Sequence, residues 1–429
     1  MPRRLIRHVA LTALALAVLV GMFVLRRAPT AARQTAAIPS NRAPAVSAVA
    51  IDAVARLRQK IDSGAVTLTF DPKTGYLSSL LTNLNIPVSS QVLVFSKSSA
   101  QMSGISPARP RAVYFNDDTY VGWVQEGGLE LTPVDPKAGP LFYTLTQEEN
   151  PPPKLERHTT TCVGCHDSSE DPSKLIPRLL LLSVLPDRDG KAIGAAALAT
   201  TDRSPFRERW GGWYVTGTHG RQTHMGNQTF RPPAGELTTI PDFIKDVDLT
   251  RGSNVTELTD RFDTKPYLRA TSDIVALMVL GHQSHVHNLI TVATYKLQEA
   301  PKGDISGRIK ALAEPVVRAM LFSGEAALTD PVAGTSSFAD DFMKQGPRDR
   351  PGRSLRDLDL KKRLLRYPLS YVIYSDSFDE MPALLKEYIY RRLREVLSGA
   401  DKSPAYAHLS AADRDAILAI LKDTKPEAL

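Results

Sequence analysis

The sequence predicts an α+β fold with a β-rich N-terminal half, a loop-rich middle and a helical C-terminal half. Two patterns predict it. Up to about residue 147, short runs rich in Val, Tyr, Phe and Thr are separated by Gly, Pro, Asn and Asp, which is typical of strands. From about residue 255, apolar residues recur in long runs at helical spacing. With 429 residues, of which 42% are hydrophobic, the chain is long enough to bury a sizeable core.

The N-terminus has the pattern of a targeting segment. A basic start is followed by the apolar run Val9–Leu25, whose length lies between the apolar part of a signal peptide and a membrane span. Arg26 and Arg27 follow at once, which favours an uncleaved signal anchor over residues 1–27. The alternative is a signal peptide cleaved near residues 31–32. The anchor places the protein on the periplasmic side of the bacterial inner membrane, and cleavage releases it into the periplasm.

The net charge of +7 is mostly local. Residues 1–34 contain six arginines and no Asp or Glu, so the rest of the chain carries a net charge of only +1. A nearly neutral body argues against a nucleic-acid-binding protein. Residues 28–48 are rich in Ala and Pro, and we expect them to form a flexible linker.

Residues 49–147 form the predicted β-rich region. It opens with an amphipathic helix that ends at Gly64. Six strand-like runs follow, namely "VTLTF", "QVLVFSK", "RAVYFN", "TYVGWVQ", "LELTPV" and "LFYTLTQ". We expect "EENPPPK" to end the sheet, because prolines cannot donate to a strand ladder.

Two further regions follow. Residues 148–235 contain a predicted hairpin turning at Asp189 and Gly190, and then a stretch rich in Gly, His and Trp without a helical period. Residues 236–429 form a helical region that we expect to pack on the region before it. Its helices are predicted at Thr271–Leu297, "ISGRIKALAEPVVRAMLFSG", "LKKRLLRYPLSYVIYS", "MPALLKEYIYRRLREVLSG" and "SAADRDAILAILKD".

The only two cysteines of the chain, Cys162 and Cys165, are followed directly by His166. The pattern CxxCH is the one to which c-type haem is attached. Its two thiols add to the two haem vinyl groups as thioethers, and two intervening residues let one helical turn present both sulfurs. The adjacent histidine is then the axial ligand of the iron. The spacing therefore predicts one covalently bound haem c, with residues 148–235 as its attachment region.

Three alternatives explain the motif less well. A structural zinc site needs four ligands, and the chain has no second cysteine pair. A redox dithiol of the thioredoxin type sits in a βαβ pattern, which is absent from this sequence. Chance places two cysteines and a following histidine at this spacing on the order of once in 10,000 sequences of this composition. The export signal also agrees with haem c, because this haem is attached after export.

At Cys162, Cys165 and His166 the sequence resembles c-type cytochromes, and the resemblance covers the motif alone. Other stretches resemble a family of exported bacterial proteins that carry a single CxxCH motif. They are "VYFNDDTYVGWVQ", "RWGGWYVTGTHG" and "LLRYPLSYVIYS". This second resemblance implies a monohaem cytochrome-c-domain protein without implying a mechanism.

A second axial ligand decides what such a haem does. A Met or His on the side opposite His166 gives an electron carrier, whereas an open side permits peroxide, oxygen or small-ligand chemistry. The stretch "THGRQTHMGN" offers His219, His224 and Met225 as candidates. The alternative is that Met225 packs in a core and both histidines bond to the backbone.

The long predicted helix offers a second set of candidates. His282 and His285 share one of its faces, whereas His287 points away from His282 by about 140°. Because this helix is apolar almost all round, we expect it to be buried. Its imidazoles then either line a haem pocket or satisfy one another and nearby carbonyls.

These observations predict an exported monohaem c-type cytochrome that passes single electrons to a redox partner protein. One alternative is a haem-dependent redox enzyme, peroxidase- or oxidase-like, with an open or displaceable distal site. The length of the chain favours it, because a simple carrier needs only about 100 residues around its haem. Another alternative is a haem-based sensor or assembly module.

Overall fold

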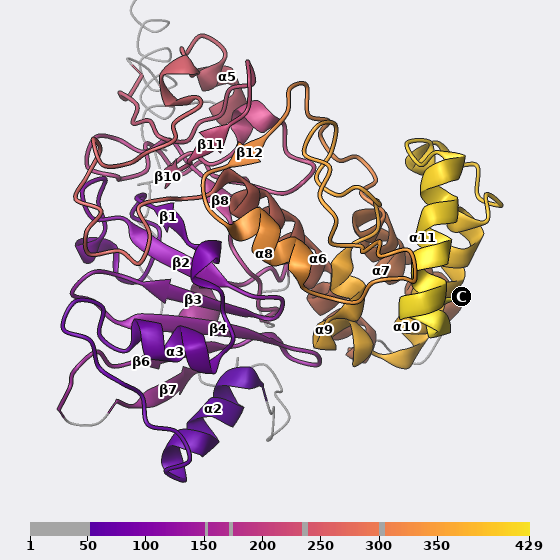
Figure 1. The fold of residues 1–429 in the computed structure, drawn as a ribbon, viewed down its shortest axis with the longest axis horizontal. Helices are drawn as coiled ribbons and strands as arrows, with labels where there is room; N and C mark the ends of the chain where they lie inside the picture. Colours follow the sequence, from indigo (N-terminus) through magenta and orange to yellow (C-terminus); the bar gives the residue numbers. More distant parts are fainter. Residues whose placement is uncertain (1–51, 151–152, 171–174, 234–238, 300–304) are drawn as a thin grey trace, which may run out of the picture. The chain divides into compact units, whose positions relative to one another are not determined.

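The structure of the chain is a computed structural model that describes residues 52–150, 153–170, 175–233, 239–299 and 305–429. The predicted targeting segment and the predicted linker lie outside the described residues. All described residues belong to one compact unit. The fold mixes helices and sheet, with an antiparallel sheet formed mainly by the N-terminal half and helices in the C-terminal half (Figure 1).

The main sheet runs in the order β10-β1-β2-β3-β4-β6-β7, and β5 pairs with the end of β4. Every pairing in it is antiparallel. Its strands are β1 (Val92–Val94), β2 (Arg111–Phe115), β3 (Thr119–Trp123), β4 (Leu129–Asp135), β5 (Gly139–Pro140), β6 (Phe142–Leu145), β7 (Leu155–His158) and β10 (Trp213–Tyr214). Five of the six strand-like runs of the sequence are therefore strands.

The two faces of this sheet bury different partners. Alternate residues such as Tyr114, Val121 and Leu131 pack against α2 (Ala53–Asp62) and α3 (Leu77–Asn83) in one core. The intervening residues point to the other face, where Tyr120 and Val134 join the core of the long helix. The period-two pattern thus places apolar side chains on both faces, as expected for a sheet covered on both sides.

Helix α6 (Ile274–Gln298) is the centre of the larger core. The carboxylate of Asp273 accepts the N–H groups of Val275 and Ala276 and so caps its first turn. Most of its residues are buried on all sides, as its composition predicts. It packs against α7 (Ile305–Met320), which in turn packs against α10 (Ala383–Leu397).

The remaining elements are short. They are α4 (Thr161–Cys165), α5 (Ile240–Ile244), α8 (Phe338–Lys344), α9 (Asp376–Asp379), α11 (Ala411–Thr424), and the strand pairs β8 (Leu182–Ser183) with β9 (Leu198–Ala199) and β11 (Gly217–Thr218) with β12 (Ala333–Gly334). The pairing of β8 with β9 confirms the predicted hairpin. Gly190 adopts a φ of +82° in its turn, which favours glycine.

Three predictions about elements are wrong. The run "VTLTF" pairs with no strand among the described residues, and its Thr69 N–H bonds to the Ser79 hydroxyl. Most of "LKKRLLRYPLSYVIYS" is not helical. Its first part closes a turn, in which the N–H of Leu360 donates to the oxygen of Arg363 at 2.9 Å. The main-chain oxygens of Leu360 and Lys362 accept N–H groups from Val332 and Leu328.

The third correction concerns the end of the sheet. The prolines of "EENPPPK" do not end it, because the following β7 pairs with β6 along its whole length. The prolines fall between β6 and β7 in sequence, and residues 151–152 lie outside the described residues. The sheet therefore extends beyond residue 147, up to the CxxCH motif.

Candidate haem-attachment site

The CxxCH motif forms the single helical turn α4. The N–H of Gly164 donates to the oxygen of Thr160 at 3.0 Å, and the N–H of His166 donates to the oxygen of Cys162 at 3.1 Å. Cys162 is half-buried and Cys165 is exposed, and both are free thiols. One turn thus presents two accessible sulfurs next to a histidine, which is the arrangement that the sequence predicts.

The backbone fixes the tautomer of His166. Its Nδ1 lies 2.9 Å from the main-chain oxygen of Arg178, and the N–H of Arg178 donates to the oxygen of His166 at 2.8 Å. Because a carbonyl oxygen can only accept, Nδ1 must carry the proton. Burial lowers the pKa of His166, which keeps the ring neutral. The lone pair on Nε2 has no hydrogen-bond partner among the described residues.

The support of His166 is tied to the main core. Leu179 follows Arg178, and its N–H donates to the side-chain oxygen of Asn288 at 2.7 Å. The side-chain amide of Asn288 donates back to the oxygen of Leu179 at 2.9 Å. Asn288 lies on α6, so this side chain pairs with the segment as a neighbouring strand would. The carbonyl that orients His166 is therefore fixed relative to the longest helix of the fold.

Beside this segment, α4 packs against β7 at the edge of the sheet. The ring centre of His166 lies 4.7 Å from that of Phe142 on β6. Phe142 is paired with His158 on β7, and the imidazole of His158 bonds to the Thr144 hydroxyl at 2.8 Å. The imidazole of His158 is thus bonded to a neighbouring strand of the sheet.

A charge pair lies on the same face of the sheet. Arg111 on β2 reaches over β3 to form an ion pair with Glu130 on β4. It passes over Gly122, where any side chain would collide with the guanidinium. Ser99 and Gln101 donate to the other oxygen of Glu130 at 3.1 and 3.0 Å. Burial opposes the ionisation of Glu130, but Arg111 and these hydrogen bonds outweigh it and lower its pKa.

The first pair of distal candidates is buried in an aromatic cluster. The rings of His219 and His224 lie 4.8 Å apart. The Nε2 of His219 accepts the N–H of Asn254, and the Nδ1 of His224 accepts the N–H of Gly226, both at 3.0 Å. Burial lowers the pKa of both, that of His224 to about 3, so both rings are neutral. Each free ring nitrogen then carries a proton, and neither histidine presents a lone pair to a metal as it stands.

Met225 lies beside this cluster and is also occupied. It is fully buried against Leu185 and Phe230 in a small separate core. Its sulfur accepts the Ser183 hydroxyl at 3.6 Å. The packing is the one expected of a core methionine.

The second pair of distal candidates shares one carboxylate. The Nδ1 of His285 lies 3.0 Å from an oxygen of Asp202, and the Nδ1 of His282 lies 3.7 Å from the same oxygen. The Nε2 of His282 bonds to the Ser370 hydroxyl at 2.8 Å. Both histidines thus face Asp202, as their shared helix face predicts. Although this is a Ser-His-Asp set, Ser370 and His282 have no exposed surface, so the set is a buried network.

His287 lies on another side of α6, as predicted. Its Nδ1 bonds to the Tyr120 hydroxyl at 3.1 Å, and Tyr120 in turn accepts the amide of Gln283 at 2.8 Å. Its Nε2 lies 3.9 Å from a carboxylate oxygen of Asp118 on the β2–β3 turn. These contacts join the sheet to the helix.

In the structure the ring of His166 lies beside Phe142 and bonds to the main-chain oxygen of Arg178. Asn288 holds the segment that carries Arg178. None of the five distal candidates makes a hydrogen bond, ion pair or ring contact with the CxxCH residues within the described ranges. Sequence reasoning missed the supporting residues, because Arg178 and Asn288 carry no motif and are joined to His166 only by the fold.

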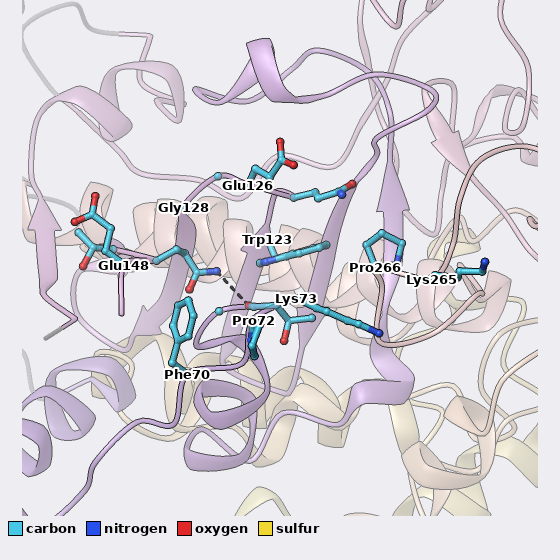
Figure 2. Close-up of a pocket in the computed structure, with 15 residues that line it drawn as sticks. Phe70, Pro72, Lys73, Trp123, Glu126, Gly128, Glu148, Lys265 and Pro266 are labelled. Carbon is cyan, nitrogen blue, oxygen red and sulfur yellow. Dashed lines mark hydrogen bonds between the residues drawn. The ribbon is translucent and has the colours of Figure 1, made fainter. Parts of the chain in front are cut away.

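A cavity of about 790 Å³ opens at one end of the sheet, next to the core that the sheet forms with α2 and α3 (Figure 2). Phe70, Trp123, Glu126, Glu148 and Lys265 are among the residues that line it. None of the CxxCH residues or the distal candidates lines this cavity. The haem prediction therefore rests on the α4 region alone.

In the part of the chain that the structure describes, no helix is both long and apolar enough to span a membrane. No group of three metal-binding His, Cys, Asp or Glu side chains occurs there. Comparison with protein-family models, with curated proteins and with solved structures gave no match.

Proposed function

We propose that the protein is an exported monohaem c-type cytochrome that transfers single electrons through one covalently bound haem. The observation that carries the proposal is the hydrogen bond from the Nδ1 of His166 to the main-chain oxygen of Arg178. A metal-binding histidine commonly donates its other ring nitrogen to a carbonyl, because this fixes the tautomer and the ring plane.

The residues fit the group. Cys162 and Cys165 supply two free thiols from one helical turn, and His166 supplies a neutral ring with its Nε2 lone pair available. When bound, a haem supplies a centre that gains and loses one electron. The chain's own contribution is to hold the ring: Arg178 fixes its proton, and Asn288 fixes the segment that carries Arg178. Residues 148–235 are then the haem-attachment region.

The place of action follows from the predicted N-terminal segment. A signal anchor over residues 1–27 holds the protein on the periplasmic side of the inner membrane, and a cleaved signal leaves it in the periplasm. Its electrons come from or go to a redox partner protein there.

The proposal is tested by producing the protein in bacteria that carry the haem c maturation machinery. We expect a covalent haem that stays with the denatured chain and gives the pyridine haemochrome spectrum of a haem with two thioether bonds. His158→Asn is the matched control for His166→Asn, since both histidines lie beside β6 but only His166 directly follows the CxxC pair, and His158 is bonded to the Thr144 hydroxyl. We expect His166→Asn to lose the native spectrum and His158→Asn to keep it.

A second candidate function is small-ligand chemistry at an open or displaceable distal side, as in a redox enzyme or a sensor. The observation that favours it is that each of the five distal candidates already has a protein partner. The two functions differ in one reaction: the reduced protein binds carbon monoxide if the distal side is open. A low-spin spectrum unchanged by carbon monoxide supports the electron carrier and contradicts the second candidate.

A further inference from the structure

The phenol of Tyr120 on β3 is bonded to the ring of His287 on α6. The oxygen of Tyr120 lies 3.1 Å from the Nδ1 of His287, and the two rings meet edge to face at 89°. Tyr120 is 7% exposed and His287 is fully buried. The pair is therefore a phenol and a base in direct contact, shielded from water.

The neighbours of the pair determine which atom donates. The side-chain amide of Gln283 donates one N–H to the main-chain oxygen of Asn116 and the other to the oxygen of Tyr120, both at 2.8 Å. The amide cannot be turned round, because the oxygen of Asn116 can only accept and the oxygen of Gln283 accepts the O–H of Tyr371. Tyr120 therefore keeps its own O–H for the Nδ1 of His287. Burial lowers the pKa of His287 to about 3, so its ring is neutral and Nδ1 has a lone pair to accept with.

The other nitrogen of His287 faces a carboxylate. Its Nε2 carries the ring proton and lies 3.9 Å from an oxygen of Asp118, and neither atom has a hydrogen-bond partner among the described residues. The side chain of Asp118 is 28% exposed, so solvent reaches it. An ionised carboxylate at this distance favours the charged form of an imidazole. The charge that His287 gains with a second proton therefore has a partner.

The sheet places this pair beside the candidate haem site. Tyr120 stands opposite Thr132 on β4, and the register of β4 with β5 and β6 places Thr132 opposite Phe142. Residues opposite one another point to the same face, and two strand spacings put the backbone of Tyr120 about 10 Å from that of Phe142. The ring centre of His166 lies 4.7 Å from that of Phe142. The pair of Tyr120 and His287 therefore lies two strands away from the histidine of the CxxCH motif.

We propose that Tyr120 and His287 form a redox-active pair next to the CxxCH site. Tyr120 gives one electron to a strong oxidant at that site; its O–H bond breaks, and the proton forms an N–H bond at the Nδ1 of His287. The oxidant is of the class that forms when haem reacts with hydrogen peroxide, so this step rests on the second candidate function. A phenol that has lost an electron is a strong acid, and a base within hydrogen-bond reach accepts its proton at once. The tyrosyl radical that remains is neutral, and regaining an electron returns the proton to its oxygen.

The test uses the full-length protein with its haem attached and held in the ferric state. Tris(bipyridine)ruthenium, oxidised by a light flash with a sacrificial electron acceptor, serves as the one-electron oxidant, and EPR detects radicals. We expect a neutral tyrosyl radical in the wild type that is absent from Tyr120→Phe. Tyr114→Phe is the matched control and keeps the radical. Tyr114 is also buried, on the neighbouring strand β2, but it donates its O–H to the side-chain oxygen of Gln91, which is not a base.

Hydrogen peroxide replaces the ruthenium complex in a second arm. We expect it to give the same radical in the wild type and in Tyr114→Phe, and none in Tyr120→Phe. A radical that forms after the flash but not with peroxide overturns the link between the pair and the haem.

A second variant separates the role of the base from loss of folding. His287→Gln keeps Tyr120 and replaces the imidazole with an amide, and we expect the radical to form about 100-fold more slowly after the flash. Its melting temperature shows that it is folded. A wild-type radical in Tyr120→Phe together with a wild-type rate in His287→Gln overturns this inference and leaves the proposed function standing. Absence of covalent haem contradicts the proposed function, and the flash experiment still decides on the pair, because the ruthenium complex oxidises a tyrosine without haem.

Discussion

The Nδ1–H of His166 donates to the main-chain oxygen of Arg178 at 2.9 Å. This bond selects the tautomer with a free Nε2, and it makes the neighbours of Arg178 part of the site. The chain from His166 through Arg178 and Leu179 to Asn288 joins a one-turn helix to the centre of the core. Stability and site geometry are therefore coupled.

Replacing Asn288 should loosen the support of His166. Asn288→Ala removes two hydrogen bonds to the backbone of Leu179, and it should cost about 1–3 kcal/mol of unfolding free energy. The Nδ1 proton of His166 should also exchange faster with solvent, which nitrogen-15 NMR measures. Gln298→Ala on the exposed end of the same helix is the control. Equal stability and exchange in the two variants would show that Asn288 does not support the site.

Asp118 should make stability depend on pH around neutrality. Burial, followed by the charges of Asp117 and Asp376, raises the pKa of Asp118 to about 7. An unfolded Asp titrates near 3.9, so the folded state holds an extra proton between these values. The charged carboxylate thus lowers stability above pH 7 and has no such effect below about pH 4.

Asp118→Asn tests this pH dependence, because its side-chain oxygen keeps an acceptor and carries no charge. We expect the variant to be more stable than wild type by about 4 kcal/mol at pH 8 and equally stable at pH 4. Urea unfolding at both values measures the difference. The exposed Asp260→Asn should change neither value. A variant that is less stable than wild type at pH 8 would show that the ionised carboxylate stabilises the fold.

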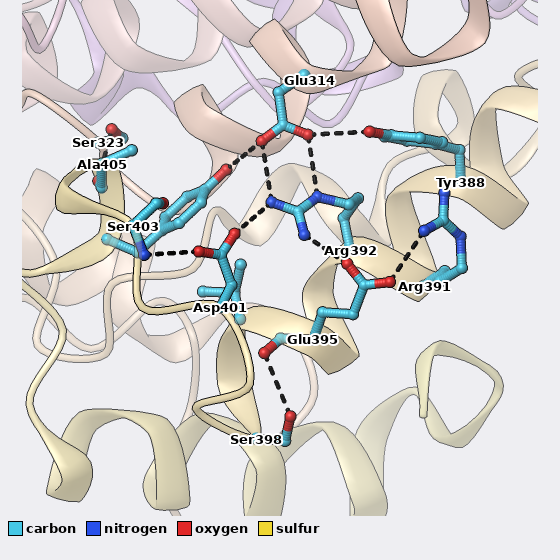
Figure 3. Close-up of polar contacts among 12 residues, drawn as sticks. Glu314, Ser323, Tyr388, Arg391, Arg392, Glu395, Ser398, Asp401, Ser403 and Ala405 are labelled. Carbon is cyan, nitrogen blue, oxygen red and sulfur yellow. Dashed lines mark hydrogen bonds and ion pairs between the residues drawn. The ribbon is translucent and has the colours of Figure 1, made fainter. Parts of the chain in front are cut away.

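Arg392 on α10 joins three acidic groups from different parts of the helical half (Figure 3). Its guanidinium bonds to Glu314 on α7 at 3.0 Å and to Asp401 at 2.5 Å. Arg392→Met leaves these carboxylates without a cation, and it should cost about 2 kcal/mol. Arg391→Met, whose side chain is 52% exposed and bonds only to Glu395, should cost at most about 0.5 kcal/mol. Equal costs would mean that the network contributes no more than a surface pair.

The same network predicts an acid transition. The hydrogen bond from Arg392 is the largest effect on Asp401, and it lowers the pKa of that carboxyl to about 2. Its stabilisation is therefore present above about pH 4 and lost as the pH falls toward 2. Unfolding measured between these values should show a pH slope in wild type that is smaller in Arg392→Met. An unchanged slope would assign the acid sensitivity to other carboxylates.

The sequence predicted the strands better than the connections. The strands within residues 111–135 pair with neighbours on both sides, so their side chains point alternately to the two faces of the sheet. The sequence predicted these strands correctly. The run "VTLTF" has the same composition without a partner, and composition cannot show whether a partner strand lies beside it. The helix predicted over residues 360–370 does not form, because the backbone there bonds to residues 328–332. This tertiary contact outweighs the helical preference of the segment.

Spacing alone singles out Cys162, Cys165 and His166 as the candidate site, and their role stays a prediction. The sequence gives no sign of the residues that hold His166 in place. Arg178 acts through its main-chain oxygen and Asn288 from 122 residues beyond His166, so neither leaves a local pattern. The tautomers of His219 and His224 depend on which backbone N–H each ring accepts, and only the fold determines that.

Mass spectrometry of the peptide that contains Cys162 and Cys165 tests the central claim most directly. The protein is matured in cells that attach haem c, denatured, digested and compared with a Cys162→Ala, Cys165→Ala double variant. We expect the wild-type peptide to carry the mass of one haem bound through both cysteines, and the variant peptide to carry none. An unmodified wild-type peptide, from cells that mature a control cytochrome c fully, would contradict the assignment of this protein as a haem c protein.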